Sequence, residues 1–326
     1  MKKLVSVLMA AAVACTAFAM AGCNSEVQEA SSAPADAAAS SADSAAAGEG
    51  GTTADLSGKL TLNGSTSMAE VCQALGEQFM AKYPGVTVEK SGNGSGDAPK
   101  AVDAGTALIG DLSRNLKDEE KPDQYEVKQV AIDGIAIAVN KESKVKDLTT
   151  DQIKKIFTGE ITNWKDVGGE DSTINVLGRE SASGTRDGFE SIFDCKEKCK
   201  YASELTSTGA VKTKVASDKT AIGYISLGNV DDTVTAVKVD GVEATEANII
   251  ADTYKAYRPF IEIYKKGGDD ELIKAWFDFV FSDEGAKTIQ GQHLIAVDAN
   301  GKPIASADTG SIPADAGTSS AASKAA

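Results

Sequence analysis

The stretch from Ile174 to Arg186 reads Ile-Asn-Val-Leu-Gly-Arg-Glu-Ser-Ala-Ser-Gly-Thr-Arg. Its apolar first half, 174–178, predicts a strand, and the polar segment 179–185 predicts a turn that leads into a helix from about Arg186. Repetition of strand, polar turn and helix is typical of α/β proteins with parallel strands. In such sheets the polar turns gather at the carboxyl ends of the strands, where ligands bind.

The same order occurs three times earlier in the chain. Each time a short apolar strand runs into a turn rich in Ser, Thr, Gly or Asp, and a helix is expected after the turn. The strands are expected at 59–62, 86–90 and 107–110, and the turns at 63–67, 91–96 and 111–114.

A long apolar segment from Val130 to Asn140, interrupted only by Asp133-Gly134, is long enough to cross from one lobe to another. We place the return crossing between about 230 and 263. The sequence therefore predicts a first lobe made of 56–140 plus 235–305 and a second lobe made of 141–234, joined by crossing strands.

The two ends of the chain are expected to lie outside this fold. Residues 1–22 combine Lys2-Lys3, an apolar run and Ala21-Gly22, which indicates an export signal, and the run is too short for a membrane-spanning helix. Ala-Gly-Cys resembles the lipobox of bacterial lipoproteins, so Cys23 is the expected lipidation site; the alternative is ordinary cleavage beside an incidental cysteine. Segments 23–55 and 306–326 are rich in Ala, Ser, Gly and acidic residues and predict a disordered tether and tail.

The charge excludes several classes of partner. The chain carries 33 basic and 48 acidic residues, for a net charge of -15, and loss of the signal removes two more lysines. Nucleic acids and anionic membrane surfaces are therefore not expected partners, and the only membrane contact is through the lipid anchor. An anionic ligand would have to be held by short, directed hydrogen bonds.

The cysteines leave alternatives open. Besides Cys23, the mature chain has Cys72, Cys195 and Cys199, and the last two are four positions apart. They could form a disulfide outside the cell, or remain free thiols. A metal site would need further ligands nearby, and the single histidine, His293, lies far along the chain. We expect no metal and no cofactor.

The four polar turns carry the chemistry. A single Ser or Thr before a helix is ordinarily just an N-cap. Several helix starts directed at one point would instead offer free N–H groups, hydroxyls and the positive ends of helix dipoles to an anion. Arg179, beside Ser-Ala-Ser-Gly-Thr, adds a planar donor suited to a tetrahedral oxyanion.

Taken together, these segments resemble the phosphate-binding lipoproteins of bacterial ABC importers. The resemblance covers about 56–299. Its landmarks are Asn63-Gly64-Ser65-Thr66, Gly92-Asn93-Gly94-Ser95-Gly96, Ile109-Gly110-Asp111-Leu112-Ser113-Arg114, Asp133-Gly134-Ile135-Ala136, the block from Ile156 to Trp164, Arg179-Glu180-Ser181-Ala182-Ser183-Gly184-Thr185-Arg186 and Ala221-Ile222-Gly223-Tyr224.

The resemblance implies a type 2 periplasmic-binding-protein fold, an α/β architecture with mixed, mainly parallel sheets in two lobes. It implies a monomer that binds inorganic phosphate between the lobes and delivers it to the permease subunits of an importer, on the outer face of the cell membrane. The expected phosphate-binding residues are Ser65, Thr66, Ser67, Ser95 and Ser113 from the first lobe and Arg179, Ser183, Gly184 and Thr185 from the second.

Asp133 and Arg114 also belong to the expected phosphate-binding set, but each has a second possible role. Some family members have an aspartate in the third turn, as acceptor for the proton of hydrogen phosphate, where this chain has Ser113-Arg114. Asp133 is the candidate replacement, with Asp111 and Glu180 next; alternatively, Asp133 lies at an exposed strand end and accepts from backbone N–H groups. Arg114 either faces the anion or pairs with a carboxylate.

Other functions have less support in the sequence. No Gly-x-Ser-x-Gly elbow or phosphate loop of the Gly-Lys-Ser/Thr type occurs, so we expect no enzyme. A binder of another tetrahedral oxyanion, such as sulfate or molybdate, remains the alternative, because hydroxyl and N–H donors suit any of them. An adhesin without a small ligand would leave the four turns unexplained.

Overall fold

The computed structural model describes residues 56–304, with the exception of residue 269. The expected signal 1–22, the lipidation site Cys23, the tether to 55 and the tail 306–326 lie outside the described residues.

The sheet of the first lobe contains three parallel strands. β1 pairs in parallel with β2 and β3. β11 lies antiparallel between β3 and the first half of β4, and the short β12 also pairs with β4. The bounds are β1 (Ser57–Gly64), β2 (Gly85–Ser91), β3 (Ile109–Leu112), β4 (Tyr125–Asn140), β11 (Tyr257–Lys265) and β12 (Ile295–Ala296).

The second lobe is built on the other half of β4. Its residues 135–139 pair antiparallel with β8, and β9 also pairs with β4. β8 pairs in parallel with β6, and β6 pairs in parallel with β7. The bounds are β6 (Asn175–Arg179), β7 (Ser203–Leu205), β8 (Ala221–Ser226) and β9 (Val234–Ala236), with a separate pair formed by β5 (Asp147–Leu148) and β10 (Lys238–Val239).

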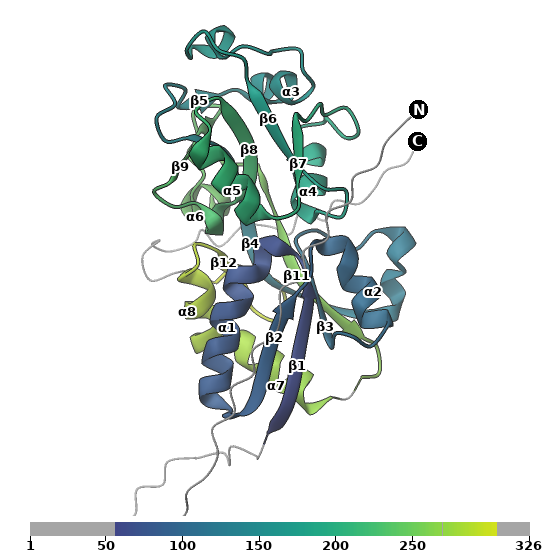
Figure 1. Ribbon diagram of the computed structural model, residues 1–326. Helices are drawn as coiled ribbons and strands as arrows, with labels where there is room; N and C mark the ends of the chain where they lie inside the picture. Colours follow the sequence, from purple (N-terminus) through teal and green to yellow (C-terminus); the bar gives the residue numbers. More distant parts are fainter. Residues whose placement is uncertain (1–55, 269, 305–326) are drawn as a thin grey trace, which may run out of the picture. The chain divides into compact units, whose positions relative to one another are not determined.

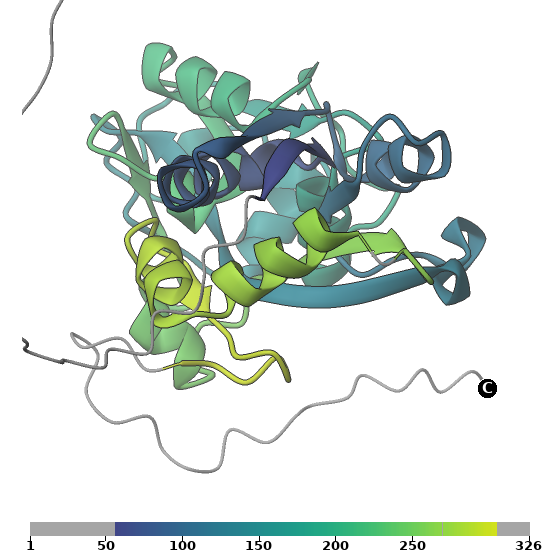
Figure 2. The same ribbon diagram turned by 90° about the horizontal axis from the view of Figure 1, so that it is seen from below.

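Helices cover both faces of each sheet (Figure 1). In the first lobe α1, α7 and α8 share one apolar cluster, around Phe79 and Trp276, and α2 packs in another with Ile261 and Ile263. Figure 2 shows α1 and α2 on separate sides of this lobe. The bounds are α1 (Ala69–Lys82), α2 (Ala98–Asp103), α7 (Glu271–Val280) and α8 (Asp283–Gln290).

Helices also cover both faces of the second-lobe sheet, because successive side chains of β4 point to opposite faces of it. Ile135, Ile137 and Val139 enter the cluster that holds α3 and α4, whereas Ala136 and Ala138 face α5. The bounds are α3 (Thr150–Phe157), α4 (Gly184–Ile192), α5 (Thr208–Ser217) and α6 (Glu246–Ile250).

The pairing of the strands bears on the lobe boundaries, and the return strand β11 begins inside the range of about 230 to 263 expected for it. Residues 135–139 pair with β8, and Val237, Ile249 and Tyr254 belong to the core of the second lobe. We therefore propose lobe boundaries near 134 and 256 rather than at 140 and 235. The apolar run from 130 to 140 concealed the boundary, because it continues on both sides of Asp133-Gly134.

The predicted α/β fold with two lobes is confirmed, and one expected element is wrong. A full helix was expected after the third turn. The structure has only two short 3-10 segments there, Asp118–Glu120 and Pro122–Gln124. A proline and a run of charged residues leave this connection without the apolar stripe that a helix needs to pack.

Candidate anion-binding site

The four predicted polar turns lie at the junction of the two lobes and are buried. Ser65, Ser95, Ser113, Ser183 and Thr185 are each no more than 2 % exposed. The turns that contain these residues follow β1, β2, β3 and β6. Each of these strands therefore ends in a polar turn at the same edge of the sheets.

Hydroxyl groups from the first lobe contact one another. Ser65 Oγ donates to Ser113 Oγ at 3.0 Å, and Ser95 Oγ lies 3.2 Å from Ser113 Oγ. The Ser113 N–H also donates to Ser95 Oγ at 3.0 Å. The three serines therefore form one connected group.

The lobes touch through hydroxyls and backbone. Ser67 Oγ lies 2.7 Å from Thr185 Oγ1 and 2.9 Å from Thr208 Oγ1. The Gly96 N–H donates to the Ala182 carbonyl at 3.0 Å. A Cβ atom added to Gly184 would lie 2.3 Å from Ser95 Oγ and 2.7 Å from Ser113 Oγ. The lobes are therefore in close contact here, and a residue larger than glycine at position 184 would require Ser95 and Ser113 to shift.

Three helix starts converge on this junction. Ser183 caps α4, because its Oγ accepts from the Arg186 N–H, and Ser207 caps α5 in the same way through the Ala210 N–H. Before α1, the Ser65 side chain accepts from the Ser67 N–H. Caps satisfy some first-turn donors, and the remaining N–H groups and the helix dipoles favour an anion at these ends.

Arg179 supplies a buried positive charge. It is 1 % exposed. Its Nη2 and Nε donate to Glu180 at 2.7 and 3.0 Å, and its Nη1 donates to Thr208 Oγ1 at 3.0 Å. Glu180 thus holds one edge of the Arg179 guanidinium in place, and the other edge of the guanidinium faces the hydroxyl cluster.

Thr208 is the residue that sequence reasoning missed. Its Oγ1 lies within hydrogen-bond distance of Ser67 and Arg179, and its N–H donates to Thr66 Oγ1 at 3.2 Å. The available signal was Ser207-Thr208-Gly209, a fifth polar turn between β7 and α5. The strand before it has only three residues and was not recognised, so the turn had no strand to follow.

Arg114 lies in ion pairs. Its Nη1 and Nη2 donate to both oxygens of Glu120 at 2.7 Å, and its Nε lies 2.8 Å from Asp187 Oδ2. Of the two roles left open for this residue, the structure therefore shows pairing with carboxylates. A contact between Arg114 and a bound anion stays a prediction.

Asp133 is fully buried, which excludes the exposed strand end offered as its structural alternative. It accepts from Ser226 Oγ at 2.7 Å and from Arg258 Nη2 at 2.8 Å. Burial raises the pKa of Asp133, and the attraction of Arg258 opposes this. The aspartate thus has a cationic partner of its own, and a role toward a bound anion stays a prediction.

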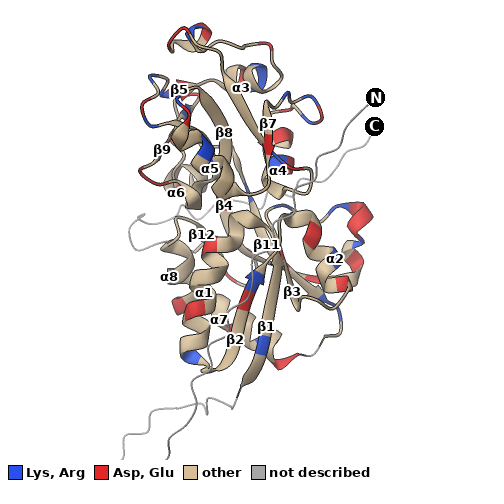
Figure 3. Cartoon of the chain, in the orientation of Figure 1, with Lys and Arg blue, Asp and Glu red and all other residues tan. Residues whose placement is uncertain are grey.

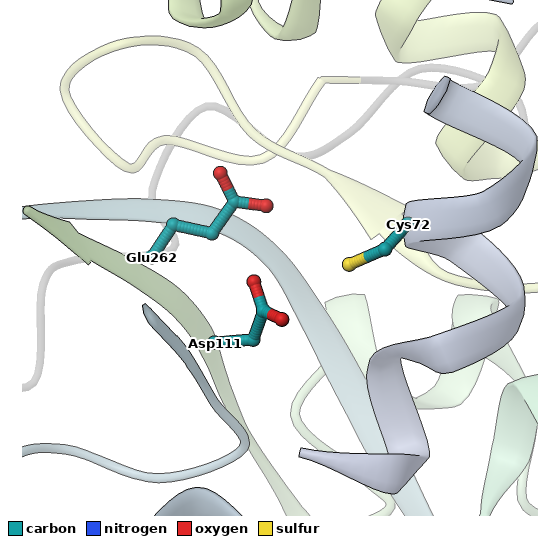
Figure 4. Close-up of side chains that lie close together, drawn as sticks. All are labelled: Cys72, Asp111 and Glu262. Atoms are coloured by element: carbon teal, nitrogen blue, oxygen red, sulfur yellow. The ribbon is translucent and has the colours of Figure 1, made fainter. Parts of the chain in front are cut away.

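Beneath the first-lobe turns lies a second buried cluster (Figure 4). Cys72 of α1, Asp111 of β3 and Glu262 of β11 direct their polar atoms toward one another, with one atom of each within 4.8 Å of the others. Lys90 Nζ lies 3.1 Å from Asp111 Oδ2, and Trp276 Nε1 donates to Glu262 Oε2 at 2.7 Å. The cluster is joined to the site, because the Asp111 carbonyl accepts from the Ser65 N–H at 2.9 Å.

These residues fit a proton better than a metal ion. Burial keeps the pKa of the Cys72 thiol well above its usual range, and a metal would need the thiolate. Lys90 already places a positive charge on Asp111. Asp111 Oδ1 and Glu262 Oε1 have no hydrogen-bond partner among the described residues. A proton on Glu262 would instead remove one of the two negative charges that lie close together in this buried cluster.

Burial, and then the negative charge of Asp111, raise the pKa of Glu262 to about 8, and burial raises that of Asp111 to about 6. At neutral pH Glu262 is therefore protonated while Asp111 is ionised beside Lys90. The buried cluster then carries no net charge, which lowers the cost of burying it.

The pair Cys195 and Cys199 has its sulfur atoms 3.3 Å apart. Cys195 is buried and Cys199 half-buried. Whether the two oxidise to a disulfide stays a prediction, and both alternatives given above fit this placement.

The fold and the site define a two-lobed solute-binding protein with an anion site between its lobes. The family profile described as PBP superfamily domain matches residues 33–284. The phosphate-binding protein PstS of Bacillus subtilis is 35% identical over 258 residues, covering 76% of this chain and 85% of that protein. The phosphate-binding protein PstS of Staphylococcus aureus is 30% identical over 269 residues, covering 76% and 82%.

Two solved structures support the same family assignment. A crystal structure with bound phosphate, of a protein from Clostridium perfringens described as a phosphate ABC transporter substrate-binding protein, has 43% identity and a TM-score of 0.72, and covers 74% of this chain and 100% of its own. An ABC-type phosphate transport receptor from Vibrio cholerae has 34% identity and a TM-score of 0.61, with 73% and 100% covered. The chain belongs to the PstS family of phosphate-binding proteins.

The buried cluster generates a test of stability against pH. The folded protein keeps the Glu262 proton up to about pH 8, whereas the unfolded chain releases it near 4.5. The free energy of unfolding should therefore fall as pH rises through this window, by up to roughly 1.4 kcal/mol per pH unit. The Asp111 carboxyl also makes the free energy of unfolding fall as pH rises, but only below about pH 6. In Glu262→Gln the slope between pH 6 and 8, measured by urea unfolding, should flatten.

Glutamine is the matched replacement because it has nearly the same size, does not titrate and keeps an oxygen that can accept from Trp276. Glu243→Gln serves as control, since Glu243 is 61% exposed and pairs only with Lys238. An unchanged slope in Glu262→Gln would show that another group holds the proton.

Proposed function

We propose that this chain binds inorganic phosphate between its lobes and delivers it to the membrane subunits of an ABC importer. The observation that carries the proposal is the meeting of three helix starts and the Arg179 guanidinium at hydroxyls from both lobes. The phosphate named for the Bacillus subtilis and Clostridium perfringens relatives supports the choice of ligand.

The proposed binding residues follow from this geometry. Hydroxyls that now bond to each other would turn toward the phosphate oxygens, and Arg179 Nη1 would add a charge-assisted hydrogen bond. The set is Ser65, Thr66, Ser67, Ser95, Ser113, Arg179, Ser183, Gly184 and Thr185, with Thr208 added from the structure.

Short-range donors have to overcome the overall charge. The chain is strongly acidic, at -15, so its long-range field opposes an anion. In the view of Figure 3 acidic and basic residues are spread over both lobes, and basic residues do not gather into one continuous patch. Binding would therefore depend on the buried site itself.

The choice between phosphate and another oxyanion depends on an acceptor. A carboxylate with a free acceptor position would favour hydrogen phosphate over sulfate. Each candidate already has a cationic partner: Lys90 for Asp111, Arg258 for Asp133 and Arg179 for Glu180. Binding of another tetrahedral oxyanion is therefore the second candidate function.

Calorimetric titration decides between these two candidates. We expect one phosphate per chain, and a melting temperature that rises with phosphate, since a ligand of the folded state adds about 2.7 kcal/mol of stability at a hundredfold excess over Kd. Sulfate and molybdate serve as matched ligands. Tighter binding of either, or no heat with phosphate after the protein has been stripped of ligand, would contradict the proposal.

The close approach at Gly184 gives a second test. In Gly184→Ala the added Cβ would meet Ser95 Oγ at 2.3 Å, so the lobes could not reach the closed arrangement without a shift. Overpacking of this kind costs roughly 1–3 kcal/mol, and phosphate affinity should fall by about tenfold to a hundredfold. Gly209→Ala is the control, because nothing lies within 4 Å of the added atom. Equal affinity in both variants would place the anion elsewhere.

The proposed place of action is the outer face of the cell membrane. Within the described residues, no helix is both long and apolar enough to cross a bilayer. We propose that a lipid on Cys23 holds the mature protein at the surface as a monomer, and that it catalyses no reaction, in line with the transport role named for its relatives.

The anchor is tested by Cys23→Ser, a change that removes the thiol to which the lipid would be attached. Phosphate binding should be retained, and the protein should move from the membrane fraction to the medium or soluble fraction. Cys72→Ser is the matched control for the loss of a thiol. Retention of Cys23→Ser in the membrane fraction would contradict lipid attachment there.

A further inference from the structure

Two ion pairs join the lobes beside the anion site. Asp187 Oδ2 lies 2.8 Å from Arg114 Nε and 2.9 Å from Lys117 Nζ. We call these contacts the interlobe ion pairs. The side chains of Arg114, Lys117 and Asp187 are 9%, 35% and 23% exposed, so water screens the contacts only in part.

The partners come from different lobes. Arg114 and Lys117 lie in the connection between β3 and β4, and Asp187 lies in the first turn of α4. Both contacts can therefore exist only while the lobes are together. On separation Asp187 would lose both cations, whereas Arg114 would keep its two hydrogen bonds to Glu120.

The interlobe ion pairs are also next to the binding turns in the chain. Arg114 directly follows Ser113, and Asp187 comes two residues after Thr185 in the helix whose start faces the site. Holding Asp187 against Arg114 thus fixes the start of α4 over Ser95 and Ser113, where Gly184 makes its close approach.

The connection that carries the cations is itself held in shape. Glu120 accepts from Arg114 and from the Lys117 N–H at 2.8 Å. Burial alone would raise the pKa of Glu120, but the hydrogen bonds from Arg114 and Lys117 lower it. The Arg114 guanidinium is therefore presented to Asp187 in a fixed geometry, which reduces the entropy lost on pairing, and the backbone of Lys117 is held beside it.

We propose that Asp187 is a positioning residue for anion binding: its ion pairs with Arg114 and Lys117 stabilise the closed lobes and slow the release of the ligand. The inference rests on the proposed function, because it assumes that the ligand leaves when the lobes part. Asp187 acts through the closure and does not touch the anion.

The experiment compares Asp187→Asn with Lys117→Met by stopped-flow measurement of phosphate association and dissociation. Lys117→Met removes one ion pair and should raise the dissociation rate by up to about fivefold, the factor that corresponds to one partly exposed ion pair, whereas Asp187→Asn removes both pairs and should raise the rate at least as much. The double variant should release phosphate no faster than Asp187→Asn, because Asp187→Asn already removes the contact that Lys117 makes.

The two substitutions change the charge in opposite directions. Removal of an acidic group would strengthen anion binding through the field alone, and removal of a lysine would weaken it. The interlobe ion pairs instead require faster release in both variants. Asp187→Glu, which keeps the charge, should restore slow release at least in part.

A pair within one lobe provides the control. Lys212 and Asp231 lie 3.0 Å apart in the second lobe, with 22% and 43% exposure. Lys212→Met and Asp231→Asn should leave the dissociation rate unchanged, and unfolding without phosphate should be no more affected in Asp187→Asn than in Asp231→Asn. A wild-type dissociation rate in Asp187→Asn, with phosphate bound normally by the wild type, would overturn the inference. Failure of the wild type to bind phosphate would instead contradict the proposed function.

Discussion

The close approach of Gly184 to the hydroxyls of Ser95 and Ser113 is the constraint on which the site depends. Because Gly184 has no side chain, the start of α4 in one lobe reaches the polar turns of the other lobe. Thr185 then comes within hydrogen-bond distance of Ser67, and Ala182 accepts from the Gly96 N–H. A larger residue at 184 would separate all of these groups together.

Charges near the junction occur in balanced sets. Arg179 is paired with Glu180, and Asp133 with Arg258. At the margin, Asp187 and Glu120 together balance Arg114 and Lys117. Asp111 has Lys90, with Glu262 kept neutral by its proton. The surroundings of the site are therefore close to neutral, and an anion would be stabilised there by hydroxyl and N–H dipoles and by one edge of a guanidinium. This agrees with a protein that holds an anion despite its acidic surface.

Much of this arrangement could be predicted from the sequence, since strand periodicity and Ser/Gly-rich turns are local signals. They located the turns at Ser65, Ser95, Ser113 and Ser183, and the order of segments indicated the fold. Thr208 was missed because the strand before its turn is only three residues long. The partners of Arg114 and Asp133 could not be predicted, because Asp187 and Arg258 are distant in sequence and become neighbours only through tertiary packing.

The position of β11 between β3 and β4 has a consequence for the order of assembly. The strands of the second lobe lie in one continuous part of the chain, between Ile135 and Val239, whereas the first lobe needs a strand from beyond residue 256 to join its two halves. Until Tyr257–Lys265 has been synthesised, β3 and β4 have open edges, which are prone to pair with other chains. The lobe that comes first in the sequence is thus the last to complete its sheet.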